Sequence, residues 1–242
     1  MGKNSKSGKY LFPDQSVYTG EMENNLPHGF GVWSHPKGEK YTGRWKDGKE
    51  NGDGVYTYPD GGKFSGQFID GLREGKGSWS HPDGSKYKGH WKKGKFNGMS
   101  VFTWSDQQIY EGEWKDGVQN GIGKTQYPDG REHLGHYHNG HENGSGDWSD
   151  REGQTYKGEF KNGEFHGKGR CHLPDGGIYE GEFVKGNIEG IGEYIFPDGN
   201  VAKGTWKNNK PWDVIGTLET GEVYGYFEKG VFQSVETFIK PV

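Results

Sequence analysis

The densest group of potential metal ligands in the chain is a histidine cluster, which comprises His133, His136, His138 and His141. On a β-strand, His136 and His138 would point to the same face, about 7 Å apart. Two imidazoles at that separation can share a zinc ion if a third ligand is supplied. A row of solvated polar side chains explains the same histidines without a metal. The pair is a metal-site candidate, and we expect no resident cofactor.

A second candidate, for nucleotide chemistry, is the glycine-rich segment 117–125, which ends in Gly-Lys-Thr. A phosphate-binding loop needs glycine at position 118, where this chain has valine, and a helix after the lysine, where the pattern predicts a strand. The sequence also lacks a serine nucleophile elbow, a Cys-x-x-Cys pair and a His-Glu-x-x-His motif. Carboxylates such as Asp47 and Asp70 fall in predicted turns. We therefore predict no enzymatic activity, no catalytic residue and no small-molecule substrate.

Lysines form a third candidate feature, because they recur in one column of the sequence: Lys46, Lys92, Lys115, Lys161 and Lys207. At an anionic membrane each lysine would contribute about 1 kcal/mol of binding free energy. Glutamates two residues earlier, such as Glu113 and Glu159, lie on the same predicted face and oppose this attraction. The chain has 30 basic and 34 acidic residues, and its formal charge of -4 gives no general attraction to nucleic acid.

These candidates are positioned by a sequence repeat of 23 residues. One glycine column comprises Gly20, Gly43, Gly66, Gly89, Gly112, Gly135, Gly158, Gly181 and Gly204. A second column runs from Gly29 to Gly190 at the same spacing, and a third lies two residues later, with Ser100 as its exception. In most repeats an aromatic residue follows the first glycine by two positions. Three columns in phase indicate a repeat architecture.

Each repeat has the pattern of a β-hairpin. Residues 41–45 alternate ring and polar side chains with a period of two, and residues 52–58 do the same. Turn-forming residues follow both segments, at 47–50 and 59–61. No segment has a helical period, and glycine at this frequency would cost a helix roughly 1 kcal/mol per residue. The predicted fold class is all-β: an elongated, single-layer, twisted antiparallel sheet of stacked hairpins.

The hairpin pattern also predicts a register between its strands. The expected facing pairs are Trp45 with Gly52, Gly43 with Gly54, and Tyr41 with Tyr56. One face then carries rings and glycines together, so that the glycines form a floor on which rings lie. A Cβ on such a glycine would collide with a ring, and Gly121→Val is expected to disrupt the array.

The repeats divide the chain without a linker. We expect a disordered tail at 1–7 and an array at 8–230, which opens on a half repeat and continues with eight regular units and degenerate last units. A terminal capping strand is expected at 231–242. The single cysteine, Cys171, takes the place of a ring and is expected to be a buried thiol in a reducing compartment. No segment has the length and hydrophobicity of a membrane helix, so a cytoplasmic location is expected.

The segment Tyr110–Gly130, YEGEWKDGVQNGIGKTQYPDG, resembles the MORN (membrane occupation and recognition nexus) repeat. The pattern of that family is Tyr-x-Gly-x-Trp, a turn glycine, Gly-x-Gly and a closing Asp-Gly. The resemblance implies arrays of hairpins that act as scaffolds in protein assemblies, sometimes dimerise, and in several members associate with membranes or acidic phospholipids. The sequence departs from the family pattern at His133, Leu134, 106–107 and 151–153. These departures mark the fifth and sixth units as the expected place for a bend or for a contact that the other units do not make.

The leading hypothesis is a non-enzymatic scaffold that docks a partner's extended strand or helix, or a second copy, in a ring-lined groove. A single-layer sheet leaves a ring-rich face that curvature or a partner must cover. The groove candidates are Tyr87, Trp91, Tyr110, Trp114, Tyr156 and Phe160. Packing against the glycines explains these rings equally well. The alternative function is a peripheral membrane adaptor that binds acidic phospholipids through the lysine column, at a membrane or the cytoskeleton.

Overall fold

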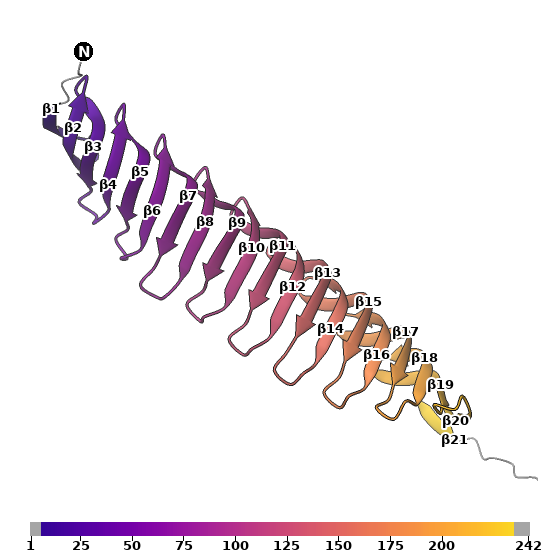
Figure 1. The fold of residues 1–242 in the computed structure, drawn as a ribbon. Coiled ribbons are helices and arrows are strands. Elements are labelled where there is room, and N and C mark those ends of the chain that lie inside the picture. Colours follow the sequence, from indigo (N-terminus) through magenta and orange to yellow (C-terminus); the bar gives the residue numbers. More distant parts are fainter. Residues whose placement is uncertain (1–5, 235–242) are drawn as a thin grey trace, which may run out of the picture. The chain divides into compact units, whose positions relative to one another are not determined.

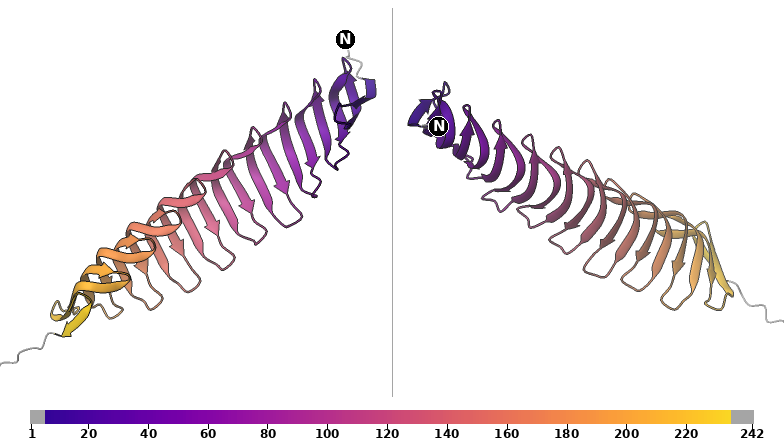
Figure 2. Two further views of the ribbon diagram at one scale, coloured as in Figure 1. Left: turned by 180° about the vertical axis from the view of Figure 1, so that it is seen from behind. Right: turned by 45° about the horizontal axis from the view of Figure 1, so that its top comes forward.

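The computed structural model describes residues 6–234 and contains no helix within them. The chain divides into two compact units, Met1–Pro128 and Asp129–Val242, here called unit 1 and unit 2. Each unit is an antiparallel succession of hairpins, which confirms the predicted all-β repeat fold. Figure 2 shows that the individual strands are curved.

In unit 1 each described strand pairs antiparallel with the next along the chain (Figure 1). The strands are β1 Lys6–Leu11, β2 Val17–Glu23, β3 Leu26–Ser34, β4 Lys40–Lys46, β5 Lys49–Thr57, β6 Lys63–Ile69, β7 Leu72–Ser80, β8 Lys86–Lys92, β9 Lys95–Thr103, β10 Ile109–Lys115 and β11 Val118–Gln126.

Unit 2 continues the same pattern of consecutive antiparallel pairing. Its strands are β12 Glu132–His138, β13 His141–Ser149, β14 Thr155–Lys161, β15 Glu164–His172, β16 Ile178–Val184, β17 Asn187–Ile195, β18 Val201–Lys207, β19 Lys210–Thr217, β20 Val223–Glu228 and β21 Val231–Ser234.

The two predicted ends of the array fall partly outside the described residues. Residues 1–5 of the expected tail lie outside them, whereas Lys6 and Ser7 already pair with β2 in the first strand. Residues 231–234 of the expected cap form β21, which pairs with β20. The remainder of that expected cap, 235–242, lies outside the described residues.

A two-residue turn closes each hairpin on one side of the sheet. Lys46 pairs with Lys49, and the two residues between them, Asp47 and Gly48, have φ angles of 50° and 82°. Positive φ at both positions defines a type I′ turn, whose twist matches that of the strands it joins. Asp, Asn and Gly reach this conformation at low cost. The turn is thus tighter than the segment 47–50 that the sequence pattern marked.

The predicted register is correct for two of its three pairs. Tyr41 faces Tyr56 and Gly43 faces Gly54, but Trp45 faces Glu50 and not Gly52. The reason is a β-bulge after Gly43, which places extra residues in the second strand. Gly52, with φ of 93°, lies in this bulge and pairs with Phe68 of the next hairpin.

Rings lie on the paired glycines, as the sequence predicted. Tyr41 has 0% exposure, and its hydroxyl donates a hydrogen bond to the carbonyl of Arg44 at 3.0 Å. A Cβ added to Gly43 or Gly54 would come within 3.0 Å of the Tyr41 side chain. A side chain at Gly43 or Gly54 would therefore require movement of the ring or the backbone, because the glycine opposite is also close. The equivalent position under Tyr87 is Ser100, whose Oγ lies 2.6 Å from the Tyr87 hydroxyl.

The explanation given for Gly121 is wrong, because this glycine belongs to the bulge and not to the ring floor. Its φ is 101°, and a Cβ there would meet the Glu113 carboxylate at 2.7 Å, on the opposite face from the rings. That carboxylate accepts a hydrogen bond from the backbone N–H of Ile122 at 3.2 Å. The equivalent bond forms in three other repeats. The backbone N–H of Phe30 donates to Glu21, that of Lys168 to Glu159, and that of Ile191 to Glu182. The glutamate column therefore satisfies backbone donors that the bulge leaves without a strand partner.

The core of each unit is a line of rings that contact one another from repeat to repeat. Centroid separations between successive repeats are 4.9 Å for Tyr18–Trp45, Tyr41–Phe68 and Phe64–Trp91 in unit 1, and 5.0 Å for Tyr156–Phe183 in unit 2. All four contacts are edge-to-face, an arrangement favoured by the ring quadrupole. The face of each unit that carries this line is here called the ring face, and the opposite face the polar face.

Candidate functional site

The six rings proposed from the sequence as a partner groove are buried in the core of the ring face. Their exposures are 1% for Tyr87, 4% for Trp91, 0% for Tyr110, 7% for Trp114, 1% for Tyr156 and 5% for Phe160. Two of them are covered by rings from the second strand of their own hairpins, since Phe96 stacks on Tyr87 and Phe165 on Tyr156, both at 3.8 Å. These six side chains can support an occupant of the ring face from below but offer it little surface.

A second row of rings in unit 1 is only half-buried and lies beside the long loops. The residues of this row, here called the ring ladder, are Trp33, Tyr56, Trp79 and Phe102, with His35, Tyr58, His81 and Trp104 two residues after them. Ring centroids are 6.2 Å apart for Trp33–Tyr56 and 6.3 Å for Trp79–Phe102. Within a repeat, Trp79 and His81 are stacked at 5.9 Å. The ladder therefore places half-buried aromatic rings in succession over four repeats.

Each repeat contributes two rings to the ladder, here called a rung, and the long loops hold the second ring of each rung in place. In the loop after β5, the backbone N–H of Tyr58 donates to the carbonyl of Gly62 at 2.8 Å, and the Asp60 carboxylate accepts the N–H of Gly62 at 2.8 Å. Arg73 donates to the Tyr58 hydroxyl at 2.9 Å, while its guanidinium lies 4.3 Å from the Trp91 ring centroid. These contacts order the ladder without a bound partner.

Carboxylates border the ladder on its loop side. Asp14 and Glu39 lie 4.0 and 3.5 Å from His35, and the Tyr56 hydroxyl donates to Glu39 at 3.2 Å. Burial, and then the Glu39 charge, raise the pKa of Tyr56 above its usual range. Two repeats on, Asp60 and Asp83 lie 3.6 and 3.0 Å from His81.

A hydrogen bond from the Ser85 backbone N–H, and then one from His81, lower the pKa of Asp83. The loop-side border of the ladder is therefore anionic at neutral pH.

The rings predicted from the sequence to contact a partner all belong to the first strand of a hairpin. The signal that points to the ladder was available in the 23-residue spacing of Trp33, Tyr56, Trp79 and Phe102.

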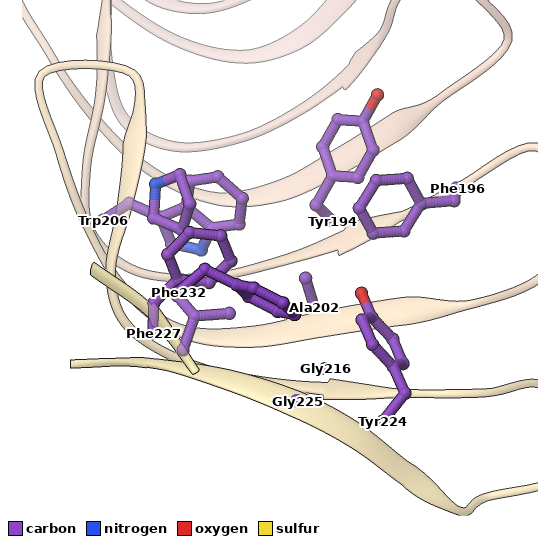
Figure 3. A pocket seen from close by; sticks show the side chains of 11 residues that line it. Tyr194, Phe196, Ala202, Trp206, Gly216, Tyr224, Gly225, Phe227 and Phe232 are labelled. Atoms are coloured by element: carbon purple, nitrogen blue, oxygen red, sulfur yellow. The ribbon is translucent and has the colours of Figure 1, made fainter. Parts of the chain in front are cut away.

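Unit 2 contains an apolar pocket of about 270 Å³ near its last hairpins (Figure 3). It is lined by Tyr194, Phe196, Ala202, Trp206, Pro211, Val214, Gly216, Tyr224, Gly225, Phe227 and Phe232. Ala202 occupies the position at which other repeats place a ring over the glycine pair, and Val214 faces Gly204 where those repeats have a second glycine. The valine fills part of the space that the missing ring vacates, and the pocket is what remains.

The two histidines considered as metal ligands have other partners. Nδ1 of His136 lies 3.1 Å from the carbonyl oxygen of Ser145, and Nε2 of His138 lies 3.1 Å from the Asn139 amide. Across residues 6–234 there is no group of three or more His, Cys, Asp or Glu residues suited to hold a metal ion.

His133 is buried over Gly135 and Gly146, in the place of the usual tyrosine. Its Nδ1 lies 2.9 Å from the Tyr137 hydroxyl, and its Nε2 has no hydrogen-bond partner among the described residues. Burial lowers its pKa. This histidine is therefore a core residue that stays neutral at physiological pH.

The lysines of the candidate lipid column are all exposed and stand next to the I′ turns: Lys46, Lys92, Lys115, Lys161 and Lys207. At the turn between β8 and β9, Lys92 pairs with Lys95 across the strands, and Lys93 lies between them. Lys207 is placed over the Trp212 ring, 4.7 Å from its centroid. The described part of the chain has no helix long and apolar enough to cross a membrane.

A family model described as the MORN repeat matches seven segments of the chain: 18–40, 41–63, 64–86, 87–109, 110–130, 156–178 and 179–201. The segment 131–155, which contains the departures at His133, Leu134 and 151–153, is not matched, whereas the departure at 106–107 lies inside a matched segment. A comparison with curated protein sequences finds no significant match.

Two solved structures that match this chain share little sequence with it. The TCP domain of SAS-4 (dCPAP) of Drosophila melanogaster, in complex with a proline-rich motif of Ana2 (dSTIL), is 15% identical over 66% of this chain and 84% of that chain, with a TM-score of 0.41. The wild-type TCP10 domain of Danio rerio CPAP is 15% identical over 91% and 99% of the two chains, with a TM-score of 0.44.

Proposed function

The chain belongs to the MORN repeat family, and from that premise we propose that it is a scaffold, and not an enzyme, that binds a protein partner along its ring face. The ring ladder of unit 1 supplies the exposed part of the binding surface. The buried groove candidates Tyr87, Trp91, Tyr110 and Trp114 form the floor beneath it, and Tyr156 and Phe160 have the same role in unit 2. Self-association is the other form of protein binding that this surface allows.

One observation carries the proposal: four successive repeats hold half-buried rings in a row, and no second layer of the described chain covers them. Burying apolar surface is favourable by about 25 cal/mol per Å², and large aromatic side chains dominate the energy of many protein interfaces. The ladder rings are also held by neighbouring rings and loop hydrogen bonds, so binding of a partner would lose little side-chain conformational entropy.

The proposal is tested by comparing two ring variants of the full chain in affinity purification followed by mass spectrometry. Trp79→Ala removes a half-buried ladder ring, and we expect it to lose partners while its melting temperature falls by only a few degrees. Trp114→Ala removes a core ring and should lower the melting temperature much more. Trp212→Ala, which removes a 37% exposed ring in unit 2, is the control for loss of an exposed tryptophan. Retention of every partner by Trp79→Ala refutes docking on the ladder.

A peripheral membrane adaptor is the second candidate function, supported by the three exposed lysines Lys92, Lys93 and Lys95 at one turn. Together with the remaining lysines of the column they could bind acidic phospholipids. Flotation with phosphatidylserine vesicles at two salt concentrations tests this function. Binding at low salt that the triple variant Lys92→Gln, Lys93→Gln and Lys95→Gln abolishes would support it, and absence of binding at low salt would exclude it. Either candidate is compatible with a cytoplasmic protein at a membrane or the cytoskeleton.

A further inference from the structure

We propose that the ring ladder of unit 1 binds a proline-rich, basic segment in the polyproline II conformation, one turn per repeat. This inference rests on the proposed function, because it names the class of partner that the ladder accepts. It is drawn from the spacing of the ladder rings, their incomplete burial and the carboxylates along their border.

The spacing of the ladder matches the pitch of a polyproline II helix. Equivalent residues of successive repeats are two strands apart, which is about 9.6 Å in an antiparallel sheet. A polyproline II helix rises about 3.1 Å per residue with three residues per turn, so one turn spans about 9.3 Å. The rings lean together in pairs, Trp33 with Tyr56 and Trp79 with Phe102. This leaning changes the spacing within a pair but leaves the period over two repeats unchanged.

The other regular conformations do not keep one face toward a ladder of this period. An α-helix covers about 9.6 Å with about 6.4 residues, which rotates the next contact roughly 80° away from the ladder. A β-strand covers the same distance with about three residues, and an odd number of residues turns the side chain to the opposite face. In polyproline II, residues i, i+3 and i+6 all point to the ladder.

The chemistry of the rungs suits proline. Pro-rich segments dock on aromatic-lined surfaces because the pyrrolidine ring packs on a flat aromatic face and the helix is already ordered before binding. Each rung presents two rings, as in Trp79 with His81 at 5.9 Å and Phe102 with Trp104 at 4.5 Å. Tyr58 and Trp104 add polar hydrogen atoms at the loop side, where the carbonyls of an extended segment could accept them.

The charges along the ladder select a basic partner. Asp14, Glu39, Asp60 and Asp83 all contact ladder rings. Two cations lie at the same border: Arg73, which donates to the Tyr58 hydroxyl at 2.9 Å, and Lys37, which is exposed in the loop after β3. The four carboxylates outnumber them. The lysines that follow the loops, Lys40, Lys63 and Lys86, are exposed and precede buried residues of the ring face, so strand alternation directs them to the polar face. Arginines between the prolines of a partner would therefore meet carboxylates and aromatic faces, both of which attract a guanidinium.

The inference is tested by isothermal titration of the full chain with two synthetic peptides of about a dozen residues. One carries proline at every third position with arginine between, and the other has the same composition with irregular proline spacing. We expect the regular peptide to bind at least about tenfold more tightly. Trp79→Ala should abolish its binding, and the control Trp212→Ala should leave its binding unchanged.

The double variant Asp60→Asn and Asp83→Asn tests the border while keeping the loop hydrogen bonds. It should weaken binding of the regular peptide by about three- to tenfold and flatten its salt dependence. Equal binding of the two peptides, or no binding of either, overturns the partner class. If Trp79→Ala still removes natural partners in that case, the proposed scaffold function stands and only the polyproline inference fails.

Discussion

Units 1 and 2 repeat the same hairpin but cover its glycine pairs differently. In unit 1 the covering side chain is a ring in every described repeat: Tyr18, Tyr41, Phe64, Tyr87 and Tyr110. In unit 2 it is a ring at Tyr156 and Tyr179, an imidazole at His133 and a methyl group at Ala202. Where the covering residue becomes small, the floor becomes large, because Val214 replaces glycine opposite Gly204. At this repeat, cover and floor change together in a way that preserves the volume of the core. The floor under Tyr87 differs in another way, because it contains Ser100, whose Oγ lies 2.6 Å from the Tyr87 hydroxyl. A full ring therefore accepts a small hydrogen-bonding side chain in the floor, and the paired exchange is specific to Ala202 and Val214.

The second row of rings differs between the units as well. Unit 1 has five rings in succession, because Tyr10 of the half repeat precedes the four column rings of the ladder at the same spacing, whereas unit 2 has Trp148 and Tyr194 separated by Cys171. Cys171 is buried at 3% exposure, and burial raises the pKa of its thiol. A buried neutral thiol fills space but extends no aromatic surface. In the described chain, a continuous ladder therefore belongs to unit 1, and an open apolar pocket to unit 2.

The sharpest test of the comparison places valine, the floor residue at position 214 of unit 2, at the equivalent glycine position of unit 1. Gly123→Val places a side chain beneath Tyr110, where a Cβ would collide with the ring, and we expect a loss of about 3 kcal/mol of unfolding free energy. The double variant Tyr110→Ala with Gly123→Val recreates the pair Ala202 and Val214. Urea denaturation should show it to be more stable than the sum of the single effects by about 1 to 2 kcal/mol. Strict additivity would contradict the paired exchange.

The reverse transfer introduces the usual ring into unit 2. Ala202→Tyr alone is expected to lower the unfolding free energy by about 2 kcal/mol, because the new ring meets the Val214 side chain. Val214→Gly in the same chain should recover at least half of the loss by restoring the glycine floor. Chemical denaturation of the single and double variants measures both effects. A stabilised Ala202→Tyr single variant would show that the pocket accepts the ring without a change in the floor.

His133 predicts that the stability of unit 2 depends on pH in a way that unit 1 does not share. Its folded pKa is lowered by burial, so below the ordinary value of 6.5 the unfolded chain binds a proton that the folded chain excludes. Stability is therefore full above pH 6.5 and declines as the pH falls toward the folded pKa. Between about pH 7.5 and 5.5 we expect a loss on the order of 1 kcal/mol.

Hydrogen exchange at the two pH values resolves the units, and only the amides of unit 2 should lose protection. The variant His133→Phe should remove this difference, whereas His138→Ala, which alters an exposed histidine, should retain it. Equal loss of protection in unit 1 would assign the effect to other groups.

The smallest expected effect concerns a feature that the two units share. Glu113→Ala and Glu159→Ala each remove a carboxylate that accepts a backbone N–H at a bulge, and each should cost about 1 kcal/mol of unfolding free energy. Arg44→Ala, at the same column position in a repeat without that acceptor, should change stability by less than about 0.5 kcal/mol. Unequal effects of the two glutamate variants would show that the bulges of the two units differ in energy.

The repeat, the strands and the turns could be predicted from sequence because they depend on local preferences. The 23-residue period, the alternation of residues 41–45 and the turn at Asp47-Gly48 each reflect what a few adjacent residues can do. The facing of Tyr41 with Tyr56 follows from the same alternation. The bulge at Gly52 could not be predicted, since alternation continues through it and only the hydrogen bonds between three strands place the extra residues there.

The placement of rings and glycines on one face follows from the sequence pattern, because side chains alternate along a strand. Only the tertiary structure decided which rings stay accessible. Trp45 is buried because it contacts Tyr18, a residue of the previous repeat, at 4.9 Å, whereas Trp79 lies beside a loop and remains half-exposed. Both are tryptophans in the same period, and their difference arises from contacts between residues far apart in the chain.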